Sequence, residues 1–431
     1  MRTKLFVAAA ALFAAPIAGF CQDVNKLIKQ EDVERVIKTL SADDMQGRGT
    51  FTPGIEKAAK FIESEFKAAG LKPMEGNDGY RQTFYQTRVT PVNPKIVFDG
   101  TAVPDEKVAV NTSAAFSWKG DTSVKVITIT DPKAYRSQMG AAMRSGKKLV
   151  VIFDAAMADD FKRIRDRAVK GSISSGRESN PMVFVLGVAE PKSIEVSCEV
   201  KEEKLPLSNI VGVIPGKSKA KEYVVFGGHY DHLGIIKPME GDSIANGADD
   251  DASGTTAVIA LAKYYKKLNN NERTLVFVAF TAEEIGGFGS RYFASKMNPD
   301  EVVALFNIEM IGKPAKFGEN SAFITGFERS DFGPILQRNL EGTAFKFYPD
   351  PYPEQNLFYR SDNASLAAVG VPAHTISTDQ IPTDKLYHTV KDEFSSLDVK
   401  NITATIRAIA LSSRSIILGK DTPTRIPKLE N

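Results

Sequence analysis

From Asn209 onward, short apolar segments with strand character alternate with amphipathic helical segments. Strands are expected at 210–214, 223–226, 274–280 and 302–308, with helices at 254–267 and from 290. Nearly continuous apolar runs are typical of strands that are buried on both faces, as in parallel sheets covered by helices. This region is therefore predicted to form an α/β fold with a mostly parallel, mixed sheet flanked by helices.

The charge balance excludes several classes of partner. The chain has 55 Lys and Arg against 53 Asp and Glu, and it is 42% hydrophobic. Without Arg2 and Lys4 of the N-terminal segment, positive and negative side chains balance. A balanced, ordinary globular composition gives no basic surface for nucleic acid or for an anionic membrane. We expect neither partner, and the sequence makes no prediction of oligomeric state.

Residues 1–21 are expected to be a signal peptide. Arg2 and Lys4 precede an apolar run that ends at Cys21, which indicates export to the periplasm or the medium. Cleavage after Cys21 is favoured over lipid attachment there, because Phe20 is not the small residue that lipoprotein processing prefers. No other apolar run approaches the ~20 residues of a transmembrane helix. Loss of Cys21 would leave Cys198 without an intramolecular disulfide partner.

The rest of the chain is predicted to form two domains. Apolar residues at helical spacing predict helices at 33–40 and 58–66, and the polar, Gly-rich segment 46–50 between them is most simply a turn. Short β-type runs characterise the stretch that follows, which indicates a smaller, β-rich module. The expected boundaries are 22–85 with 206–431 for the main domain and 86–205 for the inserted one.

Polar groups follow the predicted strands where each strand ends. They are His229 and Asp231 after 223–226, Asp249 to Asp251 before the helix at 254, Glu283 and Glu284 after 274–280, and Glu309 after 302–308. Ligands of open α/β sheets bind outside these carboxyl ends. Taken singly, His229 could be a structural histidine and the aspartates a solvated loop beside a helix N-terminus. Adjacent carboxylates at the end of a buried strand, however, require a positive partner.

The sequence has four histidines, and two of them can add nitrogen ligands to these carboxylates. His388 follows Tyr387 in a loop before the last amphipathic helix, His374 lies in an apolar stretch and is expected in the core, and His232 is expected beside the ligands or the substrate. Two histidines with three or four carboxylates form the N/O ligand set of a two-metal hydrolytic centre suited to zinc. The segment 212–218 is one residue too short for a phosphate-binding P-loop, and no HExxH, GxGxxG or GxSxG motif is present.

With these motifs in this order, residues 209–418 resemble the M28 family of zinc aminopeptidases, and residues 40–85 resemble the start of the family domain more weakly. The resemblance implies two zinc ions per chain, although cobalt or manganese could serve. It implies that His229 and Glu309 bind one ion, that Glu284 and His388 bind the other, and that Asp250 bridges both. Further roles implied are general base for Glu283, support of His229 for Asp231, and polarisation of the scissile carbonyl for Tyr387.

The chain departs from the family pattern at two positions. Glu309 stands where many members have aspartate, and Asn363 follows Arg360-Ser361-Asp362 where a histidine is frequent. The inserted module resembles a reduced protease-associated domain, which is a common insertion in this family.

The resulting expectation is an exported, metal-dependent exopeptidase, with an aminopeptidase acting on short peptides favoured. A carboxypeptidase or dipeptidase is the alternative on the same centre, because Arg360 could bind a C-terminal carboxylate. Glutaminyl cyclase has a related fold but works with one zinc, whereas both ligand sets are present here. A non-catalytic binding protein is a further alternative, but such relatives typically lose metal ligands.

Overall fold

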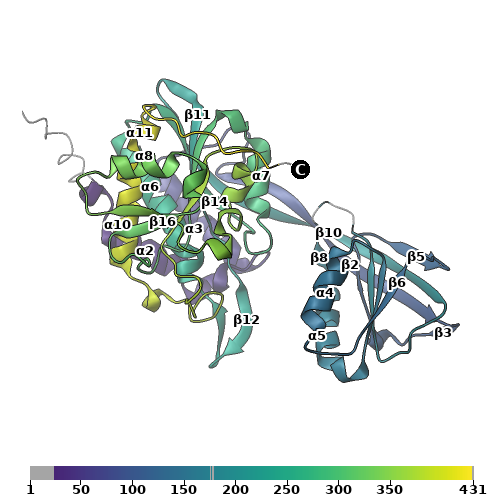
Figure 1. The fold of residues 1–431 in the computed structure, drawn as a ribbon. Helices are drawn as coiled ribbons and strands as arrows, with labels where there is room; N and C mark the ends of the chain where they lie inside the picture. Colours follow the sequence, from purple (N-terminus) through teal and green to yellow (C-terminus); the bar gives the residue numbers. More distant parts are fainter. Residues whose placement is uncertain (1–23, 175, 177–178, 430–431) are drawn as a thin grey trace, which may run out of the picture. The chain divides into compact units, whose positions relative to one another are not determined.

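The structure is a computed structural model of the 431-residue chain that describes residues 24–174, 176 and 179–429 (Figure 1). The expected signal peptide, with Cys21, lies outside these residues. The chain divides into two compact units: one runs to Phe84 and resumes at Leu207, and the other is Tyr85–Pro206. Among the described residues, no helix combines the length and the apolar character needed to cross a membrane.

The first unit is built on a mixed sheet with the strand order β17-β16-β18-β15-β11-β14-β10. Its strands are β1 (Lys72–Pro73), the end of β10 (Ile194–Ile214), β11 (Lys219–His229), β14 (Arg273–Phe280), β15 (Val302–Ile308), β16 (Ser321–Ile324), β17 (Lys346–Pro349) and β18 (Ala373–Ser377). Neighbours among β14, β11, β15 and β18 run parallel, whereas β10 and β16 run antiparallel to β14 and β18. The predicted fold class is confirmed.

The central strands are apolar along their whole length, and their successive side chains point to opposite sides of the sheet. Both faces of the sheet are therefore apolar. Val224 and Phe226 of β11 pack into one core, where the Phe226 and Phe306 rings stack with centroids 4.8 Å apart. Val225 packs into the other core. The first core is covered by α2 (Gln30–Leu40), α3 (Pro53–Ala69), α6 (Gly254–Leu268), α8 (Phe332–Asn339), α10 (Val399–Ser412) and α11 (Arg414–Ile417), and the second by α7 (Phe288–Lys296) and α9 (Asn363–Ala367).

Strand β11 is longer than the sequence indicated. Its predicted end was Phe226, but Gly227 and Gly228 continue the parallel pairing with β14, so His229 is the last residue of the strand. The glycines end the apolar pattern, which is why the extension was not predicted. Gly227 has a packing role, because a Cβ there would lie 2.5 Å from the ring of Phe280. A hairpin of β12 (Gly234–Met239) and β13 (Asp242–Ala245) projects from the same unit (Figure 1).

The second unit contains a four-stranded sheet with the order β4-β9-β7-β6. Its elements are β4 (Val108–Asn111), β6 (Lys125–Ile129), β7 (Leu149–Phe153), β9 (Met182–Leu186), α4 (Tyr135–Arg144) and α5 (Ala158–Ala168), with the short strands β3 (Thr101–Ala102), β5 (Phe116–Lys119) and β8 (Ser172–Ile173). The chain enters this second unit through β2 (Arg81–Phe98) and leaves it through β10. The free cysteine Cys198 is buried on β10. The site described next is formed entirely by the first unit.

Candidate metal centre

The predicted site residues meet at one edge of the first unit's sheet. Strands β14, β11, β15 and β18 are adjacent and parallel, so their carboxyl ends lie together. His229 ends β11, while Glu283 and Glu284 follow β14 and Glu309 follows β15. The loop before α6 brings Asp250 to this edge.

Asp250 lies between two histidines. Its Oδ1 is 3.1 Å from Nε2 of His229, and its Oδ2 is 3.1 Å from Nε2 of His388. Nε2 of His388 is also 3.2 Å from Oε2 of Glu284. One carboxylate thus presents a separate oxygen to each histidine, which is the arrangement that a bridging ligand needs.

A cavity opens beside this cluster. Asp250, Glu283, Glu309 and Tyr387 all line it, so the fifth predicted ligand lies at the same site as the other four. Glu309 accepts a 3.3 Å hydrogen bond from Nδ2 of Asn307 at its Oε2. Its longer side chain, in place of aspartate, reaches the common cavity.

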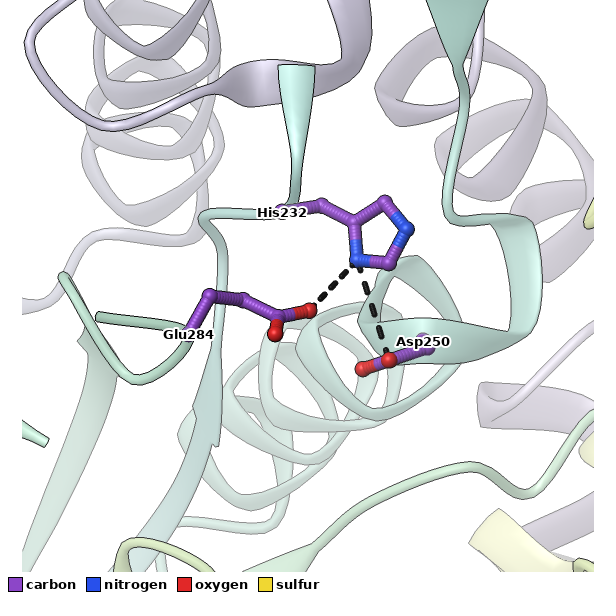
Figure 2. Close-up of side chains that lie close together, drawn as sticks. All are labelled: His232, Asp250 and Glu284. Atoms are coloured by element: carbon purple, nitrogen blue, oxygen red, sulfur yellow. Dashed lines mark hydrogen bonds and ion pairs between the residues drawn. The ribbon is translucent and has the colours of Figure 1, made fainter. Parts of the chain in front are cut away.

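His232 also belongs to this cluster, as Figure 2 shows. Its Nδ1 lies 2.7 Å from Oε1 of Glu284 and 3.7 Å from Oδ2 of Asp250. His232, Asp250 and Glu284 could themselves hold a metal ion, because their ligand atoms lie within 4.8 Å of one another. A buried ring that faces both carboxylates fits the expectation of a residue beside the ligands.

The tautomer of His229 is informative about a bound cation. Its Nδ1 lies 3.1 Å from the carbonyl oxygen of Asp231, which can only accept, so Nδ1 carries the proton. In the neutral ring, Nε2 then presents a lone pair to the Asp250 carboxylate. Nε2 is buried and has no hydrogen-bond partner. A divalent cation held by His229 and Asp250 would remove this repulsion, so the residues present fit a divalent metal.

A family model for peptidase family M28 matches residues 209–412, the segment that contains every histidine and carboxylate of the site described so far. Over these residues the chain is similar to peptidase family M28. The resemblance inferred from the sequence is therefore confirmed.

Individual proteins are also similar to this chain. Leucine aminopeptidase 1 of Ajellomyces capsulatus strain H88 is 27% identical over 241 residues, which cover 52% of this chain and 60% of that relative. The chain thus spans less than two thirds of the length of the curated relative it matches. The aminopeptidase from Aneurinibacillus sp. strain AM-1 has a TM-score of 0.55 and 17% identity, over 95% of this chain and 97% of that chain. The zinc aminopeptidase BSAP from Bacillus subtilis has a TM-score of 0.55 and 15% identity, over 90% of this chain and 95% of that chain. At such identities these two structures establish the fold.

Within the M28 region, Asp231 acts through different atoms from those expected. Its backbone carbonyl, rather than its carboxylate, accepts the proton of His229, while Oδ1 is 3.9 Å from Nδ1. The carboxylate instead accepts the backbone N–H groups of Glu283 and Glu284 at 3.0 and 3.3 Å. Asp231 therefore fixes the strand end of β11 to the turn after β14.

The interpretation of Asp249 to Asp251 as a solvated loop is wrong, because all three aspartates are buried. Only Asp250 faces the histidines. Asp251 accepts backbone N–H groups of His229, Gly254 and Met310 at 3.0–3.2 Å, and so ties three segments of the M28 region together. The sequence carried no signal that separated this structural aspartate from its neighbours.

Arg48 is a positioning residue that the sequence did not reveal. It was placed in a plain turn, but its side chain is completely buried. The guanidinium donates to the carbonyl oxygens of Leu40, Tyr230 and Asn246 at 2.6–2.8 Å and to that of Gly247 at 2.9 Å. Three of these carbonyls, those of Tyr230, Asn246 and Gly247, belong to the segments that carry His229 and Asp250. The weak family resemblance of the Gln46-Gly47-Arg48 turn was the available signal.

The charges at the site differ according to their surroundings. Burial, followed by the charges of Asp362 and Asp231, raises the pKa of Glu283 well above its usual value. Although burial alone would raise the pKa of Asp250, the adjacent imidazole groups of His229 and His232 hold that pKa well below the usual range. Burial raises the pKa of Glu309 in the same direction, so Glu283 and Glu309 are both suited to taking up a proton, whereas Asp250 is suited to remaining charged.

Tyr387 lines the cavity next to His388, and the two rings stack with centroids 3.8 Å apart. Burial and the charges of Asp250 and Glu284 raise the pKa of Tyr387 far above its usual value, so the phenol keeps its proton and can donate it in a hydrogen bond. Arg360 lines the same cavity but its side chain is exposed.

Asn363 has a structural role. Its Nδ2 donates to the carbonyl oxygens of Phe358 and Ala373, and its Oδ1 accepts from the hydroxyl of Thr375 at 3.0 Å. The family resemblance led us to consider a histidine at this position, but the asparagine here is completely buried and its polar atoms are bonded. We therefore assign Asn363 no contact with substrate.

His374 is a core residue, as expected, and it should make stability depend on pH. Its Nδ1 donates to the carbonyl of Thr325, and its Nε2 accepts from the hydroxyl of Ser330. Burial lowers the pKa of His374 to about 4, below the ~6.5 of an unfolded histidine. The unfolded chain then binds the proton first, so we expect stability to fall as the pH drops from ~6.5 toward 4, by about 2 kcal/mol at pH 5.

Urea unfolding at pH 7 and pH 5 measures this effect. The variant His374→Gln should lose about 2 kcal/mol less than the wild type between the two pH values, since glutamine does not titrate. An equal pH dependence of wild type and variant would contradict the assignment.

Proposed function

We propose that the chain is a dinuclear zinc aminopeptidase that releases N-terminal residues from peptides. The observation that carries this proposal is the position of Asp250, with one oxygen 3.1 Å from each of two histidine Nε2 atoms. In this proposal His229 and Glu309 would hold one ion, Glu284 and His388 would hold the other, and Asp250 would be a ligand of both. Cobalt or manganese could replace zinc, because the donor set is nitrogen and oxygen.

When bound, the metal ions polarise the scissile carbonyl and lower the pKa of water toward neutrality. Glu283 takes the proton of the attacking water and passes it to the amine that leaves. Its raised pKa and its place on the cavity wall support this role. The hydrogen bond from its backbone N–H to Asp231 fixes the segment that carries it.

Tyr387 donates its phenolic hydrogen to the oxygen of the tetrahedral intermediate, a contribution of about 3–4 kcal/mol for a well-placed donor. His232 orients Glu284 by donating from Nδ1 across 2.7 Å. This contact directs the second oxygen of Glu284 toward His388. The proposal thus gives each buried polar group at the site a separate task.

A carboxypeptidase or dipeptidase is the second candidate. Arg360 lies on the cavity wall, where its guanidinium could bind a substrate carboxylate. The leucine aminopeptidase relatives favour release from the amino end. The export inferred from residues 1–21 and a protease-associated character of residues 86–205 are further parts of the proposal.

Blocked peptides and a chelator test the function together. We expect the zinc-loaded protein to hydrolyse aminoacyl arylamides and C-terminally amidated dipeptides but not N-acetylated dipeptides. Dialysis against a chelator should abolish this activity, and zinc should restore it, because the ligand carboxylates act only through the ions.

The same experiment distinguishes an aminopeptidase from a carboxypeptidase and from a binding protein. Cleavage of N-acetylated but not amidated dipeptides would establish a carboxypeptidase. Stoichiometric zinc without hydrolysis of any peptide would establish a binding protein. Metal analysis of the same samples gives the number of ions per chain.

A further inference from the structure

We propose that the cavity beside the metal centre selects peptides whose N-terminal residue has a cationic side chain, lysine or arginine, and that Asp379 is the residue that recognises it. This inference rests on the proposed aminopeptidase function and specifies its substrate class.

Asp379 reaches the site from a fourth strand end. It follows β18, which pairs in parallel with β15 so that Ile376 is level with Ile308. Asp379 therefore lies at the same edge of the sheet as Glu309. It lines the cavity together with Asp250 and Glu283, although nothing in the proposed chemistry uses it.

The carboxylate of Asp379 forms no ion pair with a basic side chain among the described residues, because the nearby Lys313 pairs with Asp249 and Asp384. The residue is only 3% exposed, and neither of its oxygens receives a hydrogen bond from the described residues. Only by taking up a proton could Asp379 form a hydrogen bond with its acidic neighbour Asp384. A buried carboxylate in this situation is costly unless a cation reaches it.

The charges around Asp379 are not balanced, because three carboxylates lie near one lysine. Asp249, Asp379 and Asp384 have carboxylate oxygens within 4.8 Å of one another. Lys313 pairs with Asp249 at 3.2 Å and with Asp384 at 2.6 Å. Burial and the charges of Asp249 and Asp384 raise the pKa of Asp379 to about 8. One lysine thus serves two carboxylates, and the third faces the cavity.

The missing cation is best supplied by the side chain of the substrate's first residue. The α-amine of a bound peptide is adjacent to the carbonyl that reacts, so it stays at the metal centre. The charges that act most strongly on Asp379 are instead those of Asp249, Asp384 and Lys313. The cavity wall also includes the apolar side chains of Phe323, Leu357 and Ile381, which suit the methylene stem of a lysine or arginine.

Matched substrates test this proposal. The zinc-loaded protein should cleave the p-nitroanilides of lysine and arginine with a kcat/KM about 10–100-fold above that of norleucine, which has a similar stem without charge. Asp379→Asn should remove most of this preference and leave norleucine cleavage within about threefold of the wild type. The control Glu354→Gln, which removes an exposed acid from the same part of the chain, should keep the preference.

A wild-type preference for norleucine, or an equal loss on all substrates in Asp379→Asn, would overturn the proposal. Calorimetric binding of lysinamide and norleucinamide to the zinc-loaded wild type gives a second test that needs neither turnover nor a folded variant. Tighter binding of lysinamide supports the inference even if no arylamide is cleaved, in which case only the proposed function fails. If calcium raises the unfolding temperature of the wild type but not of Asp379→Asn, and the preference is absent, the cation is inorganic and the proposal is wrong.

Discussion

Glu283→Gln is expected to lower kcat/KM for an aminoacyl arylamide by about 10²–10⁴-fold while both metal ions stay bound. Glutamine has nearly the same size, but its amide does not take the proton of the attacking water. Glu283 is not among the assigned ligands, and its backbone hydrogen bond to Asp231 does not depend on the side chain. The measurement is steady-state kinetics on samples whose zinc content is determined in parallel.

The exposed residue Glu319 provides the matched control, because Glu319→Gln makes the same chemical change away from the cavity. Its activity should equal that of the wild type. Wild-type turnover in Glu283→Gln would remove Glu283 from the mechanism. A loss of one metal ion in that variant would show instead that Glu283 is a ligand.

Arg48→Lys is expected to destabilise the first unit by about 3–5 kcal/mol, although it preserves the charge. A lysine ammonium is a single centre and cannot span carbonyls from four different residues, so several of them would be left buried without a donor. We expect the midpoint of thermal unfolding to fall by about 6–20 °C. Zinc affinity should also fall, because the segments of His229 and Asp250 lose their common anchor.

The same substitution at Arg136, which is exposed on α4, should leave the midpoint unchanged. If Arg48→Lys unfolds at the wild-type temperature, the buried guanidinium contributes no net stability. Unchanged zinc affinity in a destabilised variant would limit the role of Arg48 to folding.

Much of the first unit was predictable because its strands carry strong local patterns. The apolar run of β15 gave its bounds of Val302–Ile308 directly from the sequence, and α6 was predicted to within one residue. Errors occurred where tertiary contacts override local pattern. Gly227 and Gly228 are poor strand formers, yet pairing with β14 and the nearby ring of Phe280 keep them in β11.

The site residues that could be predicted are those whose charged side chains are costly to bury. Glu283, Glu284 and Glu309 stood out because carboxylates rarely follow apolar strands without a positive partner. Arg48 and Asp251 did not, because each acts on backbone groups of distant segments that no spacing in the sequence reveals. Asp379 was not predicted for a different reason. The strand before it is short, and the residues around it are too polar to mark a strand end.

The loop that carries Asp250 illustrates this dependence on distant segments. Gly247 has a φ of +57°, and a Cβ at this position would lie 2.5 Å from the ring of His232. The backbone N–H groups of Asp249 and Asp250 are both held by the carboxylate of Asp392, 142 or more residues away in the chain. A short acidic sequence before a helix contains none of this information.

The separation between residues that perform chemistry and residues that hold the backbone has an evolutionary consequence. Asp231, Asp251, Asp392 and Arg48 fix the strand ends through main-chain groups, so the framework does not rely on Glu283. A single nucleotide change that converts the Glu283 codon to glutamine would preserve this framework while removing turnover. Descendants of such a gene could keep the pocket as a peptide receptor, and selection could then act on recognition alone.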